Sequence, residues 1–119
     1  MVVDLYAGNE STSRLFHALA DATRRDIVRR SLDAEHSVSG LSRNYAISLT
    51  AVQKHVTVLE QAGLVTKHRR GREQIVSGNA HALRRAREAL EQLEAVWRDR
   101  IARIDDIISE PGEGATTCP

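Results

Sequence analysis

The sequence predicts a mainly α-helical fold that carries one small β-hairpin. Apolar residues recur at spacings of three and four over most of the chain, as they do on the buried face of an α-helix. Two short runs, residues 65–70 and 73–77, flank a turn at Gly71 and read as two paired strands. A last run, from residue 79 to residue 109, keeps a near-heptad apolar pattern typical of a long helix.

Length and composition set the limits of the interpretation. The 119 residues are enough for one domain with a modest core, and 41% hydrophobic and 28% charged residues are usual for a soluble globular protein. No apolar run reaches the roughly 18 residues of a membrane span, and no signal peptide opens the chain. The single cysteine, Cys118, cannot form an intrachain disulfide. We therefore expect a cytoplasmic protein with no membrane partner.

Four helices are predicted before the hairpin, over residues of about 11–19, 22–32, 37–45 and 49–62. Asp21, Ser37 and Ser48 stand at three of the starts, where a side-chain oxygen can accept hydrogen bonds from the free N–H groups of the first turn. Gly63 can adopt the left-handed conformation that ends a helix. The inner faces of the first three helices are apolar: Leu15, Phe16, Leu19, Ile27, Val28, Leu32, Val38 and Leu41.

Residues 37–71 carry the strongest functional signal. They are predicted to form a short helix, a tight turn, a second helix and a basic hairpin. The second of these helices has a buried stripe at i, i+4 and i+7, made of Val52, Val56 and Leu59. Another face, at i, i+3, i+4 and i+7, carries only side chains that can hydrogen-bond: Thr50, Gln53, Lys54 and Thr57. This order predicts a winged helix-turn-helix, which places its second helix in the major groove of DNA.

The net charge of +1 hides an uneven distribution. Residues 36–78 hold six Lys or Arg and two acids, which leaves a net charge of +4. Residues 105–119 hold four acids and no Lys or Arg, a net charge of −4. A basic centre of this kind is typical of a protein that binds an anionic polymer.

The long last helix carries the second informative pattern, a seam of apolar residues at steps of three and four: Leu83, Ala86, Leu90, Leu93, Trp97, Ile101, Ile104 and Ile108. Packing along its whole length within one chain is one interpretation. Pairing with a second copy, joined by the first helix, is the favoured one, because the remaining domain is too small to cover such a seam. Trp97 is then a packing residue, with the wall of an effector pocket as the alternative.

Three runs carry a resemblance to a known family: LFHALADATRRDIVRRSL, VSGLSRNYAISLTAVQKHVTVLEQAGLV and the RRGRE of the wing. Together they resemble the ArsR-type winged-helix repressors of prokaryotes, from about Leu15 to Ile108. The resemblance implies a dimer paired through its first and last helices, which binds operator DNA in the cytoplasm, in association with the nucleoid. Many members release DNA when an effector binds, so an unknown effector is a possible partner.

The metal sites of this family are not intact in the sequence. One family site uses a C-x-C pair, and the matching residues here are Ser37 and Ser39, whose hydroxyls are poor ligands for soft metals. At the second site the family's ligands are matched by Asn79, His81, Gln92 and Ala95, so one ligand of four remains. We therefore expect no metal and no cofactor. A thiol-sensor role for Cys118 is a minor alternative.

The other histidines leave alternatives open. His55 is either a framework residue of the fourth helix or a phosphate contact, and His68 is either a phosphate contact or simply exposed. His17 is expected at a dimer or intramolecular contact, and His36 in solvent. No G-x-S-x-G, P-loop, H-E-x-x-H or dinucleotide-binding motif is present, so we do not expect an enzyme.

The expected function is that of a sequence-specific DNA-binding regulator, a dimeric repressor of a palindromic operator. A dimeric winged-helix module that binds another protein is the alternative. Residues 11–109 are predicted as the DNA-binding and dimerisation domain, between a flexible arm (1–10) and a disordered acidic tail (110–119). The predicted DNA-binding residues are Ser48, Thr50, Gln53, Lys54, His55, Thr57, Lys67, His68, Arg69, Arg70 and Arg72. The predicted dimer-interface residues are Leu15, Phe16, Leu19, Leu83, Leu90, Leu93, Trp97, Ile101 and Ile104.

Overall fold

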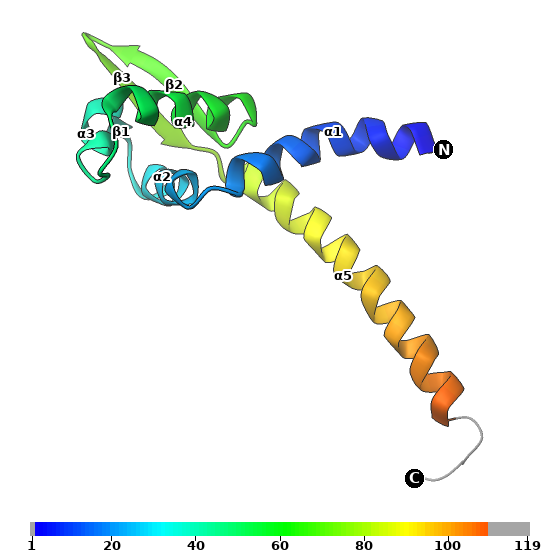
Figure 1. Ribbon diagram of the computed structural model, residues 1–119. Coiled ribbons are helices and arrows are strands. Elements are labelled where there is room, and N and C mark those ends of the chain that lie inside the picture. Colours follow the sequence, from blue (N-terminus) through cyan, green and yellow to red (C-terminus); the bar gives the residue numbers. More distant parts are fainter. Residues whose placement is uncertain (1, 110–119) are drawn as a thin grey trace. The chain divides into compact units, whose positions relative to one another are not determined.

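A computed structural model describes residues 2–109 of the chain, and the side chains of residues 10–108 (Figure 1). The expected mainly helical fold with a small sheet is confirmed. The elements are α1 (Val2–Leu19), α2 (Ala22–Asp33), β1 (His36–Ser37), α3 (Val38–Ser42), α4 (Leu49–Gln61), β2 (Val65–Arg70), β3 (Glu73–Gly78) and α5 (Ala80–Ser109). The predicted acidic tail and Cys118 lie outside the described residues. No described helix is long and apolar enough to cross a membrane.

The chain divides into two compact units with a boundary after Ala86. The first unit holds α1 to β3 and the first turns of α5, and it contains the hydrophobic core. Aliphatic side chains from all five helices and from the sheet form this core: Leu15, Ala18, Ile27, Val28, Val38, Leu41, Val52, Val56, Leu59, Leu64, Val65, Val76, Ala82 and Ala86.

The sheet has the strand order β1-β3-β2, and both pairings are antiparallel. The hairpin register runs from Val65 opposite Gly78 to Arg70 opposite Glu73, which leaves a two-residue turn. Gly71, the first residue of this turn, has a φ of 64°, a value that glycine adopts without strain. Strand β1 was not predicted, because a two-residue strand shows no alternation.

Three helix starts and one helix end follow the predicted local chemistry. The side chains of Asp21, Ser37 and Ser48 cap α2, α3 and α4 by accepting from backbone N–H groups. Gly63 follows α4 with a φ of 81°, as expected for a left-handed stop. Leu64 N–H then donates to the Leu59 carbonyl over 3.0 Å, which turns the chain towards β2.

Several predicted boundaries and one core residue were wrong. Helix α1 begins at Val2, so the segment predicted as an arm is helical, although its sequence lacks an amphipathic period. Helix α3 ends at Ser42 instead of Tyr45. Leu32 is 39% exposed and lies over Gly78, while Ser31 takes the buried position.

The turn after α3 is anchored to α2 through Asp26. Its carboxylate accepts from Arg29, Arg30 and the Tyr45 hydroxyl, each over 2.7 Å. These hydrogen bonds, that of Arg30 first, hold the pKa of Asp26 well below its usual range. Burial and the neighbouring carboxylate raise the pKa of Tyr45 to about 12.

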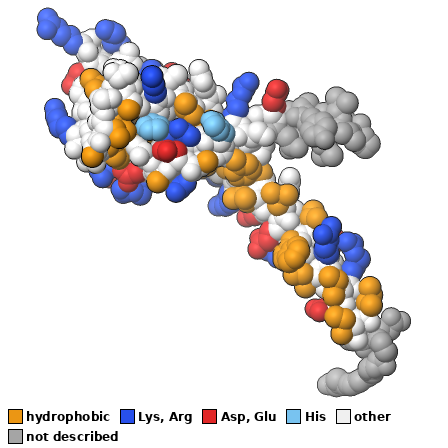
Figure 2. All heavy atoms as spheres, in the orientation of Figure 1, with side chains coloured by type: hydrophobic (Ala, Val, Ile, Leu, Met, Phe, Trp, Pro, Cys, Tyr) orange, Lys and Arg blue, Asp and Glu red, His pale blue; other side chains and the backbone are white. Residues whose placement is uncertain are grey.

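The second unit is the remainder of α5. Its polar side chains form ion pairs at i, i+4, Arg87 with Glu91 and Glu94 with Arg98, as the spacing predicts. Its apolar side chains are exposed in the single chain: Leu90, Leu93, Val96, Trp97, Ile101, Ile104, Ile107 and Ile108. Figure 2 shows them as a run of hydrophobic side chains along α5.

The Asp26 anchor predicts an acid-dependent part of the stability. Because the folded-state pKa is lowered, the anchor stabilises the fold above the unfolded-state pKa of about 3.9 and loses this effect as the pH falls below it. Asp26→Asn should therefore lower the free energy of unfolding by about 1–2 kcal/mol at neutral pH. The difference in free energy of unfolding between the parent and the variant should become smaller towards pH 2. Denaturant titration at fixed protein concentration measures this. A difference that does not depend on pH would contradict the role of the Asp26 charge. Tyr45→Phe is the control, because it removes one hydrogen bond to Asp26 but no charge.

Candidate nucleic-acid interface

Helices α3 and α4 and the turn between them form a helix-turn-helix. The turn opens with backbone hydrogen bonds from Arg43 to the Gly40 carbonyl and from Asn44 to the Leu41 carbonyl. Ser48 then caps α4, and its Oγ accepts from Ala51 N–H over 3.1 Å. These local bonds position the first turn of α4 at the surface of the molecule.

Helix α4 has the two faces that its sequence predicts. Val52, Val56 and Leu59 are fully buried in the core, and Gln53 and Lys54 are exposed. Because the buried stripe fixes the rotation of the helix, the Gln53 and Lys54 side chains have to face solvent. Thr50, in the first turn of α4, is exposed as well.

Thr57 differs from its neighbours on this face. It is half-buried, and its hydroxyl donates to the Gln53 carbonyl over 3.0 Å. This bond within the helix occupies the hydroxyl hydrogen and leaves the oxygen lone pairs and the methyl group for any contact.

His55 contacts α2 and its N-cap residue. Its Nδ1 lies 3.2 Å from Nη1 of Arg24, and its Nε2 lies 4.0 Å from Oδ2 of Asp21. Arg24 in turn donates to the carbonyls of Ala18 and His17 over 2.8 and 3.1 Å. This placement favours the framework interpretation of His55, because the ring is half-buried and already partnered.

The cations of the β2–β3 hairpin are not equivalent. Lys67 Nζ lies 3.6 Å from Glu60, and Arg70 Nη2 lies 3.0 Å from Glu35. Arg69 and Arg72 are exposed and form no ion pair with the described residues. Figure 2 shows Lys and Arg side chains at the outer end of the hairpin.

Glu35 is a site residue that the sequence did not reveal. Its carboxylate accepts from Arg70 and from the Ser77 hydroxyl over 3.0 and 3.2 Å, and these two bonds lower the pKa of Glu35. His68 is exposed, and its Nε2 lies 3.4 Å from Arg70 Nη2. No local pattern marks Glu35, because its partners follow it by 35 and 42 residues.

The residues predicted at the dimer interface fall into three groups. Leu15 is fully buried within one chain, so it is a core residue and not an interface residue. Phe16, Leu19 and Leu83 are half-buried and pack against the core. The remaining predicted residues are exposed: Leu90, Leu93, Trp97, Ile101 and Ile104.

Two residues at the positions of the family's metal ligands have other roles in the structure. Ser37 Oγ accepts from Gly40 N–H over 3.0 Å and caps α3. The Asn79 side chain donates to the Gly63 carbonyl over 2.9 Å and accepts from His81 N–H over 3.0 Å. Among residues 10–108, no three His, Cys, Asp or Glu side chains gather as a metal site would require.

Comparison with known proteins gives consistent relatives, although no family model matches the chain. The HTH-type transcriptional regulator YuzN of Bacillus subtilis is 36% identical in an alignment of 83 residues that covers 64% of this chain and 90% of the relative. The HTH-type transcriptional regulator Rv2034 of Mycobacterium tuberculosis is 30% identical over 103 residues, which are 87% of this chain and 94% of the relative.

A solved structure shares the fold. The ArsR-like transcriptional regulator from Rhodococcus sp. RHA1 superposes with a TM-score of 0.74 at 31% identity, over 85% of this chain and 95% of that chain. The helix-turn-helix, the hairpin wing and these relatives agree with the family that the sequence resembles. The chain belongs to the ArsR family of winged helix-turn-helix transcriptional regulators.

Proposed function

We propose that the protein is a dimeric repressor that binds a palindromic operator in double-stranded DNA. The observation that carries the proposal is the exposed polar face of α4. It stands in the same unit as a basic hairpin in which two arginines pair with no acid of the described residues. Helix α4 enters the major groove, and the hairpin lies along the neighbouring backbone. The same surface would have no reason to discriminate between DNA sequences if the partner were another protein.

Base reading is assigned to the first two turns of α4. The Gln53 amide suits the paired donor and acceptor of adenine, and Lys54 suits guanine or a phosphate. Thr50 and Ser48 lie at the start of the helix, where side chains reach base edges or nearby phosphates. Thr57 and His55 are assigned to supporting contacts, because each is half-buried and hydrogen-bonded within the protein.

Backbone affinity is assigned to the hairpin, the wing of the fold. Arg69 and Arg72 bring full positive charges that no acid of the described residues neutralises. Lys67 and Arg70 contribute less, because they are paired with Glu60 and Glu35. His68 is also assigned a smaller contribution. Such contacts release counterions from DNA, so the affinity depends on salt.

Dimerisation is assigned to the apolar seam of α5, together with Phe16 and Leu19 of α1. The seam residues Leu90, Leu93 and Trp97 are 54%, 64% and 59% exposed in the single chain. Such a continuous apolar run is typical of an interface that a second copy covers. A two-fold dimer presents two α4 helices to half-sites about one turn of DNA, roughly 34 Å, apart.

Repression follows from occupancy of a promoter in the prokaryotic nucleoid. The domain that carries this function is residues 11–109, the range in which the reading helix, the wing and the seam all lie. A competition gel shift with the DNA upstream of the gene, at two salt concentrations, tests the proposal. Equal affinity for that DNA and for random DNA would favour the protein-binding alternative.

The base-reading assignment predicts a loss of specificity. Gln53→Ala combined with Lys54→Ala should lower the preference for operator over random DNA by about 1–3 kcal/mol per lost contact, because neither side chain supports the core. Competition binding measures the preference, and a circular dichroism melt checks the fold. Arg84→Ala, which removes an exposed cation of α5, is the control and should keep the parent's preference. Unchanged specificity in the double variant would exclude these residues as readers.

The structure of the wing predicts that its arginines contribute unequally to DNA affinity. Arg69→Ala with Arg72→Ala should weaken operator and random DNA about equally and lower the salt slope by roughly two phosphate equivalents. Arg70→Ala combined with Glu35→Gln should have a smaller effect than Arg69→Ala alone, because the ion pair that it removes carries no net charge. Binding isotherms over a salt series give both quantities. A loss of affinity in the Arg70→Ala, Glu35→Gln variant as large as that in Arg69→Ala would contradict the inequivalence of these cations.

The seam predicts the assembly state. Leu93→Glu would place a carboxylate opposite its own symmetry mate in an apolar interface, at a cost of several kcal/mol. Sedimentation should then show monomers, and operator affinity should collapse although Leu93 touches no DNA. Gln92→Glu adds the same charge one residue away, off the seam, and should remain a dimer. A stable Leu93→Glu dimer with normal operator affinity would show that α5 does not form the interface.

A further inference from the structure

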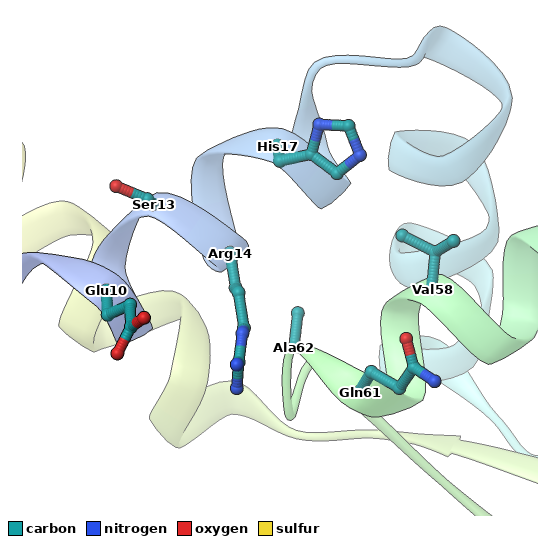
Figure 3. A pocket seen from close by; sticks show the side chains of 7 residues that line it. All are labelled: Glu10, Ser13, Arg14, His17, Val58, Gln61 and Ala62. Atoms are coloured by element: carbon teal, nitrogen blue, oxygen red, sulfur yellow. The ribbon is translucent and has the colours of Figure 1, made fainter.

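A hollow lies between α1 and the C-terminal end of α4, within the first unit (Figure 3). Its volume is about 730 Å³, within the range of roughly 300–1,000 Å³ that small-molecule sites occupy. Neither the core nor the proposed DNA contacts account for it. We call it the α1–α4 pocket.

One wall of the α1–α4 pocket is a polar row on α1. Glu10, Ser13, Arg14 and His17 line it at the spacing i, i+3, i+4 and i+7, so they share one helical face. The opposite face of this helix supplies Leu15 and Ala18 to the core. All four side chains are solvent-exposed, so the row forms an open polar wall that a polar ligand can reach.

Arg14 is the charge at the centre of this row. Glu10 precedes it by four residues, the spacing at which a Glu and an Arg pair readily on a helix. No ion pair between them is present, nor between Arg14 and another acid of the described residues. Figure 3 shows the Arg14 side chain reaching along the hollow between Glu10 and Ala62. With respect to the described residues, its guanidinium is therefore available to bind an anion.

The facing wall comes from the last turns of α4. Val58 and Ala62 are half-buried and pack against the core, so they offer an apolar floor. Gln61 is exposed beside them, and its amide can both donate and accept a hydrogen bond. The α1–α4 pocket thus combines the Arg14 guanidinium, which pairs with no acid of the described residues, with an amide and an apolar surface.

This combination specifies a class of ligand. A guanidinium recognises a carboxylate with two parallel hydrogen bonds, and the floor of Val58 and Ala62 suits a hydrocarbon body. Glu10 at the same wall repels a second negative charge. We propose that the α1–α4 pocket binds a small organic molecule with a single carboxylate and an apolar body.

The α1–α4 pocket is coupled to the DNA-reading face, a consequence that rests on the proposed function. The same helix, α4, lines the pocket with its last turns and carries Gln53 and Lys54 in its first turns. The backbone of His17 also accepts from Arg24, which bonds to His55 in the middle of α4. A ligand between α1 and α4 therefore acts on α4 in two ways. It acts directly on the last turns of α4, and indirectly through the hydrogen bonds that join His17, Arg24 and His55.

Ligand-observed NMR on the full-length protein, without DNA, tests the site itself. The probes are phenylacetate, hexanoate and 4-phenylbutyrate, each with its matched primary amide, and the dicarboxylate adipate. At least one monocarboxylate should bind with a Kd in the millimolar range expected for ligands of this size. Its amide and adipate should bind at least about tenfold more weakly. Binding by none of the three monocarboxylates, or equal binding of acid and amide, would overturn the proposal.

Variants then locate the site. Arg14→Gln should abolish binding of the carboxylate, and Glu10→Gln should bring adipate close to the monocarboxylates. Arg84→Gln, which removes an exposed cation outside the pocket, should bind as the parent does. Chemical-shift changes confined to α1 and the end of α4 would support the site, and changes elsewhere, or retained binding in Arg14→Gln, would overturn it.

Coupling is measured last, as the Kd of the best carboxylate with and without saturating operator DNA. The two values should differ by about fivefold or more, and operator affinity should change by the same factor when the carboxylate is saturating. A ratio of one would overturn the coupling and leave the binding result standing. If the operator itself is not bound specifically, the proposed function fails, while the NMR result still decides the site.

Discussion

The rotation of α4 about its own axis is the constraint on which the rest of the molecule depends. Val52, Val56 and Leu59 have no exposed surface, and each buried aliphatic side chain contributes roughly 1.5–3 kcal/mol. A rotation that turned Gln53 inward would expose this stripe and bury an amide without a partner. Hydrophobic burial therefore decides which side chains of α4 are exposed to a partner, although Val52, Val56 and Leu59 are themselves apolar.

Much of this arrangement could be predicted from the sequence, because it depends on local signals. The caps at Asp21, Ser37 and Ser48, the stop at Gly63 and the two faces of α4 all follow from residue types within one or two helical turns. The hairpin was predicted for the same reason, since a glycine turn and two short alternating runs lie within fourteen residues of sequence, 65–78.

The structural features that the sequence did not predict either join residues far apart in the chain or depend on what covers a helix face. The Glu35–Arg70 pair and the contact of Arg24 with His55 join residues more than thirty positions apart. Leu15 was assigned to the dimer because its apolar stripe on α1 looks the same whether a core or a partner covers it. The α1–α4 pocket was missed because its walls come from two helices whose polar residues look like solvated faces when each is considered alone.

The contacts that hold one edge of the β2–β3 hairpin affect the entropic cost of binding. A two-stranded hairpin alone is only marginally stable in water. A hairpin that became ordered only on binding would lose conformational entropy, and its affinity would be lower. Here β1 adds a third strand on one side, and Glu35 holds both Arg70 on β2 and Ser77 on β3. In the proposed complex with DNA, the wing is therefore preorganised before it binds. Glu35 reduces the charge of the wing by one, but it also lowers the entropic cost of binding through the remaining charges.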